Sequence, residues 1–226
     1  MPDDLEELKK THDQMVRLRD GLVAQAEALK AQLQAKQREL EAQGRELEEK
    51  RRAKEELAEI EFRATHDSLT GLWNRAGILD ILRRELVRAK REGLMVGVLL
   101  ADLDRFKNVN DTYGHLAGDE VLREASRRMS EAVRSYDAVG RYGDDYFLVV
   151  LAGCESKLDA IAQAERIRWM TCTDAVHAKE GEIPISVSIG GTVTTKCLEE
   201  ESLIRAADSA LYRAKRAGGN RVEWKI

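Results

Sequence analysis

Two aspartates follow a strongly apolar run of the sequence, MVGVLLA at 95–101. Asp102 and Asp104 flank Leu103, and side chains alternate between the two faces of a strand. Both carboxylates therefore lie on one side of the predicted strand, with Leu103 on the other. Acids at the end of a buried strand can bind Mg²⁺ together with phosphate oxygens. Solvated acids also end many strands, so this pair alone leaves both interpretations open.

A second acidic pair, Asp144 and Asp145, lies in RYGDDYF (141–147) between two apolar runs. The pattern predicts two strands within 137–153 that are joined by a tight turn. If this hairpin lies beside the first strand, its acids meet Asp102. Carboxylates clustered in this way form a divalent-cation site.

A basic segment follows the first strand. RFKNVND, residues 105–111, combines Lys107 with the backbone N–H groups of a turn, which predicts a phosphate cradle. A helix is then expected at 118–134, with Asp119 and Glu120 in its first turn, where negative charge suits the helix dipole.

The rest of the pattern predicts strands that alternate with helices. Helices are expected at 75–91, 157–170 and 201–219, and strands at 93–104, 183–195 and 220–226. This order predicts an α/β or α+β sheet with helices packed on its faces.

Residues 1–63 differ in composition from the rest of the chain. They contain no proline after Pro2 and are rich in good helix formers. Apolar residues recur there at three- and four-residue spacing: Leu8, Met15, Leu22, Ala26, Leu29, Leu33, Leu40, Leu47 and Leu57. A helix this polar has no core of its own, so a parallel coiled-coil dimer is predicted, with a solvated single helix as the alternative. Polar residues in the seam weaken such a coil and allow a change of register.

Composition excludes few functions but sets expectations about partners. The formal net charge of −4 gives no reason to expect nucleic acid or an anionic membrane as partner. No apolar run approaches the roughly 18 residues of a membrane span, and the highly charged start does not read as a secretory signal. Cys154, Cys172 and Cys197 lack metal-type spacing and are predicted to be buried thiols. A cytoplasmic protein is expected.

Four segments are far more specific together than singly. DSLTGLWNR (67–75), DLDRFKNVNDTYGHLAGDEVL (102–122), RYGDDYF and ALYRAKRAGGNRV (210–222) occur in this order. Residues 64–226 resemble the GGDEF family of diguanylate cyclases. The resemblance implies an α+β, ferredoxin-like sheet related to nucleotidyl cyclase and polymerase palms, preceded here by the coiled coil. It also implies condensation of two GTP into cyclic di-GMP with release of two pyrophosphates.

By matching position, the resemblance implies roles for individual residues. Asp102, the Leu103 carbonyl and Asp145 would hold Mg²⁺ or Mn²⁺. Asn110 and Asp119 would recognise guanine by hydrogen bonds, because a carboxylate accepts well from the N1–H and N2–H₂ groups of that base.

The resemblance also implies a set of phosphate contacts. Lys107 and Lys215 would face the phosphates, beside the backbone N–H groups of Arg105 and Phe106. Gly143, the first letter of the signature, belongs to the same substrate site, and Lys107 joins the two metal-binding aspartates as a catalytic residue.

Two further features follow from the family's chemistry. Arg134 and Asp137 match the family's RxxD inhibitory site, where the arginine can bind cyclic di-GMP with two hydrogen bonds. The alternative is that the two residues form only a surface salt bridge. Each domain binds one GTP, so a parallel homodimer through the coil would bring two half-sites face to face. A register shift in the coil is the hypothesis for control.

The signature itself departs from the family pattern G-G-D/E-E-F. It reads G-D-D-Y-F here, so Asp144 replaces a glycine and Tyr146 replaces an acid, while Gly219 stands where an arginine is frequent. Asp144 adds negative charge beside a triphosphate, and a phenol ligates Mg²⁺ poorly. Three hypotheses stay open: a cyclase, working or slowed; a domain that binds cyclic di-GMP or GTP without turnover; and a passive scaffold.

Overall fold

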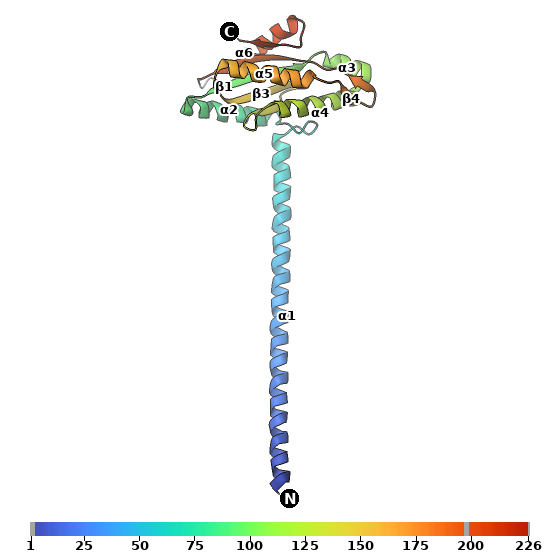
Figure 1. The fold of residues 1–226 in the computed structure, drawn as a ribbon, viewed down its shortest axis with the longest axis vertical. Coiled ribbons are helices and arrows are strands. Elements are labelled where there is room, and N and C mark those ends of the chain that lie inside the picture. The colour runs from blue at the N-terminus through green and yellow to red at the C-terminus, as the bar shows by residue number, and fades with distance from the viewer. Residues whose placement is uncertain (1–2, 197–198, 226) are drawn as a thin grey trace. The chain divides into compact units, whose positions relative to one another are not determined.

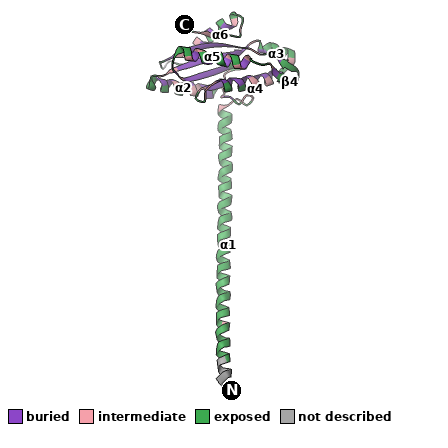
Figure 2. Cartoon of the chain, in the orientation of Figure 1, coloured by how far each residue is buried: buried purple, intermediate pink, exposed green. Residues whose placement is uncertain are grey.

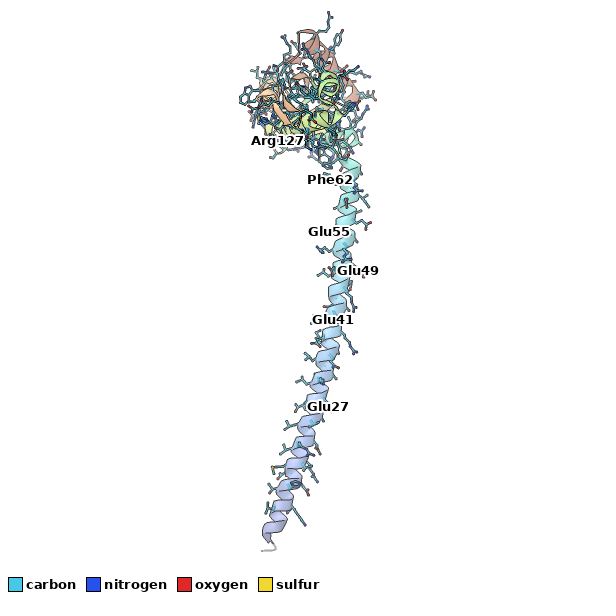
Figure 3. The ribbon with its side chains drawn as sticks, turned by 90° about the vertical axis from the view of Figure 1, so that its right-hand side faces the viewer. Glu27, Glu41, Glu49, Glu55, Phe62 and Arg127 are labelled. Atoms are coloured by element: carbon cyan, nitrogen blue, oxygen red, sulfur yellow. The ribbon has the colours of Figure 1, made fainter. Side chains whose placement is uncertain are left out.

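The computed structural model describes residues 3–196 and 199–225, with side chains from Leu8 onward. The chain divides into two compact units, Met1–Glu59 and Ile60–Ile226. Helix α1 (Asp3–Thr65) runs through the first unit and into the start of the second, and it confirms the long N-terminal helix. From Leu8 to Ala64 its side chains are exposed except for Val16, and Figure 3 labels several of its exposed glutamates.

A five-stranded mixed sheet forms the centre of the second unit. Its strands are β1 (Met95–Leu103), β2 (Ala138–Arg141), β3 (Tyr146–Cys154), β6 (Val187–Thr194) and β7 (Val222–Trp224). Their order is β2-β3-β1-β6-β7, so β1 lies in the middle; β6 and β7 run parallel and the other neighbours antiparallel. A separate two-stranded sheet consists of β4 (Val176–Ala178) and β5 (Gly181–Ile183).

Helices cover both faces of the sheet. They are α2 (Arg75–Glu92), α3 (Phe106–Tyr113), α4 (His115–Ala132), α5 (Lys157–Cys172) and α6 (Glu200–Arg216). One core cluster joins α2 and α6 to the sheet, and the other joins α4 and α5 to its opposite face. Figure 2 shows the buried strands between helices whose outer sides are exposed.

Alternation along β1 decides which face each of its side chains meets. Val98 and Leu100 belong to the cluster with α2 and α6, whereas Leu99 and Leu103 belong to the cluster with α4 and α5. Asp102 continues the row of Val98 and Leu100, so its carboxylate points toward α6.

The predicted α+β sheet with flanking helices is confirmed, with differences in detail. Helix α4 begins at His115, so the prediction that Asp119 lies in its first turn is wrong. The reason is Gly114, whose φ of +86° ends α3 and lets α4 start at the next residue. Helix α3 was not predicted, because RFKNVND reads as a turn, and the β4–β5 hairpin was not predicted either.

Two compositional predictions can be compared with the structure. Cys154 is buried and Cys172 is half-buried, while Cys197 lies outside the described residues. Within residues 3–196 and 199–225, no helix combines the length and apolar content that a membrane crossing requires.

Candidate functional site

The pairing of β1 with β3 brings the two predicted acidic segments together. Asp102 lies opposite Tyr146, and the Leu103 N–H donates to the Asp145 carbonyl at 3.4 Å. Asp102 is only 8% exposed, and Asp145 is half-buried. Burial raises the pKa of Asp102, and the neighbouring charge of Asp145 raises it further, against the opposing effect of Lys215. The pKa of Asp145 is likewise raised, first by burial.

Lys215, in the last turn of α6, reaches this acidic end of β1. Its Nζ lies 2.6 Å from Asp102 Oδ1 and 3.0 Å from Asp104 Oδ1. It also donates to the backbone oxygens of Asp102 and Leu103, each at 3.3 Å. The Lys215 ammonium therefore lies among the oxygens that the family resemblance assigns to a metal ion.

Asp104 has a role that the sequence did not reveal. Its carboxylate accepts from the hydroxyls of Ser186 and Ser188 at 2.7 Å and from the Asn220 N–H at 2.9 Å. Burial acts to raise its pKa, but these hydrogen bonds and Lys215 outweigh burial and lower it. Asp104 thus ties the end of β1 to the start of β6 and to the segment after α6. The only sequence signal was its shared face with Asp102.

The segment after α6 contains Gly219, which stands where an arginine is frequent in the family. Gly219 has a φ of +78°, and a Cβ there would lie 2.9 Å from Asp104 Oδ1. Any side chain at 219 is therefore strained in this conformation and crowds Asp104.

The donor set fits a hard divalent cation in its chemistry. Two carboxylates, Asp102 and Asp145, and the Leu103 carbonyl supply oxygen only, which suits Mg²⁺ and Mn²⁺. Among the described residues, no group of three or more acidic, histidine or cysteine side chains is placed to hold a metal. Water or the phosphate oxygens of a nucleotide would complete the coordination shell.

The start of α3 borders a cavity of about 500 Å³, which Asp104, Arg105 and Asn108 help to line. Arg105 adopts the left-handed conformation, with φ of 56°, immediately before the helix. Phe106 is buried and anchors the first turn, while Lys107 is exposed. The Asn108 N–H donates to the Arg105 carbonyl at 2.8 Å, so the N–H groups of Phe106 and Lys107 are the first-turn donors left for a ligand.

Asn110 and Asp119 come from the adjacent helices α3 and α4, and both are half-buried. Gly118 lies directly under the Asn110 amide: a Cβ there would overlap Asn110 Oδ1 and lie 3.4 Å from the Phe106 ring. A residue without a side chain is thus needed for Asn110 to keep this position, which the sequence alone did not indicate.

The β2–β3 turn forms without the backbone conformation that favours glycine. The Tyr142 and Gly143 N–H groups both donate to the Tyr146 carbonyl, at 2.7 and 3.1 Å. Asp144 is exposed and is not among the described residues with positive φ, so replacing glycine there causes no strain. Arg141 donates to the Asp144 carbonyl at 2.8 Å and to Asp67, which fixes the turn.

Tyr146 replaces the fourth acid and turns toward the cation site. Tyr146 lies opposite Asp102 in the β1–β3 register, and the charge of Asp102 raises the pKa of the phenol. The carboxylate predicted to bind metal is therefore paired with Lys215 and has a phenol as its cross-strand neighbour.

Comparison with known proteins identifies this architecture. The family model described as "Diguanylate cyclase, GGDEF domain" matches residues 64–221. The chain belongs to the GGDEF family. It is 45% identical over 161 residues to diguanylate cyclase DosC of Escherichia coli, covering 70% of this chain and 35% of DosC. The chain thus spans about a third of the length of that relative.

Solved structures agree with this assignment. The coiled coil and GGDEF domain of DgcB from Caulobacter crescentus, in complex with c-di-GMP, superposes with a TM-score of 0.74 at 30% identity. That match covers 82% of this chain and 98% of DgcB. Diguanylate cyclase SiaD from Pseudomonas aeruginosa, in complex with its activator SiaC, gives 0.69 at 32% identity, covering 98% of this chain and 86% of SiaD.

The RxxD residues of this GGDEF domain lie together after α4. Arg134 and Asp137 line a cavity of about 310 Å³. Asp137 accepts from the backbone N–H groups of Arg134 and Ala152, at 3.0 and 2.9 Å. The Arg134 guanidinium instead pairs with Asp159 of α5, at 2.8 and 3.3 Å, and lowers the pKa of that carboxyl. A bound anion would have to compete with Asp159.

Proposed function

We propose that the chain is a diguanylate cyclase domain that condenses two GTP into cyclic di-GMP and two pyrophosphates. The observation that carries this proposal is the pairing of β1 with β3, which holds Asp102, the Leu103 carbonyl and Asp145 at one site. Relatives at up to 45% identity are named diguanylate cyclases, which supports the assignment.

Each residue then has a role in binding one GTP. Asn110 and Asp119 orient guanine, and the first-turn N–H groups of α3 bind phosphate with Lys107. Asp102 and Asp145 hold Mg²⁺ or Mn²⁺. When bound, this cation activates the 3′-hydroxyl and stabilises charge on the reacting phosphorus.

Turnover needs two such domains. The 3′-hydroxyl of one GTP attacks the α-phosphorus of the other and expels the first pyrophosphate; the reciprocal attack then expels the second and closes the ring. We infer that residues 1–63 form a parallel coiled coil that holds two 64–226 domains in one dimer. Exposed apolar side chains of α1, among them Leu22, Leu29 and Leu40, support this inference, because dimerisation would bury them. A cytoplasmic location, where GTP is available, completes this proposal.

Product control is the second part of the proposal. The Arg134 and Asp137 segment would bind cyclic di-GMP as an inhibitor, and its neighbouring cavity supports such a site. Arg134 would leave Asp159 to pair with a phosphate of the ligand.

A second candidate function rests on the altered signature. Lys215 pairs with the Asp102 carboxylate and a phenol replaces the fourth acid opposite it, which favours a domain that binds GTP or cyclic di-GMP without turnover. Asp144 favours it less, since its exposed charge is screened by solvent and the turn needs no glycine at 144.

The deciding experiment measures GTP turnover with Mg²⁺, with chromatography for cyclic di-GMP. Asp145→Ala should lower the rate at least about 100-fold, because it removes a metal ligand. Asp80→Ala, at an exposed acid of α2, is the matched control.

A restored variant, Asp144→Gly with Tyr146→Glu, separates the two functions. Product from the protein as given supports the cyclase. Product from the restored variant alone supports the binding domain. No product from either contradicts the proposed chemistry.

A further inference from the structure

Lys215 is placed where a bound cation is expected. Its ammonium lies within 3.3 Å of four oxygens, which belong to Asp102, Leu103 and Asp104. An ammonium has three N–H groups, so all of its donors are used by this end of β1. Two of these oxygen sources, the Asp102 carboxylate and the Leu103 carbonyl, are also proposed ligands of the divalent cation.

The surroundings explain why a cation is needed there in the free protein. Asp102 and Asp104 share one face of β1, and Asp145 adds its charge from the β2–β3 turn, next to the start of β3. Three neighbouring carboxylates repel one another in a partly buried site. Lys215 offsets this repulsion, and its side chain is 29% exposed, which leaves it room to turn outward.

We propose that the Lys215 ammonium holds the cation position until nucleotide binds, and that it thereby couples metal binding to nucleotide binding. The inference rests on the proposed function, since it takes Asp102 and Leu103 as metal ligands. Nζ lies so close to the Asp102 carboxylate and the Leu103 carbonyl that it would repel a divalent cation bound there, so the ammonium must first withdraw. The phosphates of GTP give it a new partner, and Asp104 keeps it close to them.

This exchange has a thermodynamic consequence. Without nucleotide, a divalent cation must displace an ion pair and binds weakly. With nucleotide, the displaced ammonium gains phosphate contacts and the cation binds tightly. Because coupling is reciprocal, the cation must tighten nucleotide binding by the same factor.

The test measures Mn²⁺ affinity by electron paramagnetic resonance in the absence of nucleotide. Lys215→Met keeps the length of the side chain and removes its charge. We expect it to bind Mn²⁺ at least about tenfold more tightly than the unmodified protein. Lys179→Met, at an exposed lysine in the β4–β5 turn, should change nothing. Equal or weaker Mn²⁺ binding by Lys215→Met would overturn the proposal.

Two further measurements locate the effect. Adding Asp102→Asn to Lys215→Met should abolish the gained Mn²⁺ binding; if the gain persists, the cation binds elsewhere and the proposal fails. With a non-hydrolysable GTP analogue present, the unmodified protein should bind Mn²⁺ as tightly as Lys215→Met does. If neither protein binds Mn²⁺ even then, the proposed metal site itself is refuted.

Thermal unfolding gives a readout that does not depend on tight binding. Without metal, Lys215→Met should melt at a lower temperature than the unmodified protein, because three carboxylates lose their cation. Mn²⁺ should raise the melting temperature of Lys215→Met more than that of the unmodified protein. An equal rise in both would contradict the exchange.

Discussion

Gly118 offers a way to move the proposed guanine contact without touching the residue that makes it. A Cβ at position 118 would overlap Asn110 Oδ1 and lie 3.1 Å from Asn110 Cγ, whereas carbon atoms prefer about 3.5–4.0 Å. The amide must therefore swing away when Gly118→Ala is made. Its Oδ1 is the far end of a side chain, so the fold can absorb this change.

Stability should then stay nearly unchanged while nucleotide binding weakens. Alanine is favoured over glycine in a helix interior by about 1 kcal/mol, which offsets the local crowding in α4. A displaced binding group, by contrast, costs up to about 100-fold for a shift of about 1 Å. We expect the melting temperature of Gly118→Ala to stay near that of the unmodified protein, and the Kd for a GTP analogue to rise about 10- to 100-fold.

Isothermal titration calorimetry and thermal unfolding measure the two quantities. Gly21→Ala is the matched control, because it makes the same change within helix α1 with nothing within 4 Å of the added Cβ. It should leave nucleotide affinity unchanged.

A double-mutant cycle with Asn110→Ala decides whether Asn110 transmits the effect. Once the amide is removed, Gly118→Ala should weaken binding no further. Unchanged affinity in Gly118→Ala alone, with a normal fold, would refute the reasoning that Asn110 reads guanine from this position.

Two further changes test the inhibitory site and the pH dependence of stability. Asp159→Asn removes the charge that pairs with Arg134, so cyclic di-GMP should bind about 3- to 10-fold more tightly. Calorimetry measures this affinity, and weaker binding would mean that Asp159 orients Arg134 for the ligand. Arg127 and Arg128 lower the pKa of Glu124 from 4.5 to about 2, so its charge stabilises the fold above about pH 4.5 and this contribution is lost as the pH falls toward 2. Glu124→Gln should cost about 1 kcal/mol in urea unfolding at pH 7, and a difference that did not shrink toward pH 2.5 would contradict this cause.

Local pattern alone predicted much of the scaffold. The apolar run before Asp102 predicted the central strand, and the turn around Gly143 predicted the β2–β3 hairpin, both of which are confirmed. The long helix at the N-terminus followed from its helix-forming composition. These features depend on residues that are close together in the sequence, so the local sequence pattern is enough to predict them.

The tertiary structure decided which side chains of the site lie close together. Asp102 and Lys215 are 113 residues apart, and only the packing of α6 against β1 brings them into contact. The turn of Tyr146 toward Asp102 depends on the β1–β3 register. A shift of that register by one residue would point the hairpin side chains to the opposite face of the sheet.

The sequence by itself therefore determined which oxygens, amides and lysines are available, and in what order along the chain. The tertiary structure decided which of them come together: Lys215 pairs with Asp102 opposite Tyr146, while Asp104 connects β1 to Ser186, Ser188 and Asn220. The physical reason is that hydrogen bonds and ion pairs act over a few ångströms, so they depend on where the packed helices and strands place each side chain.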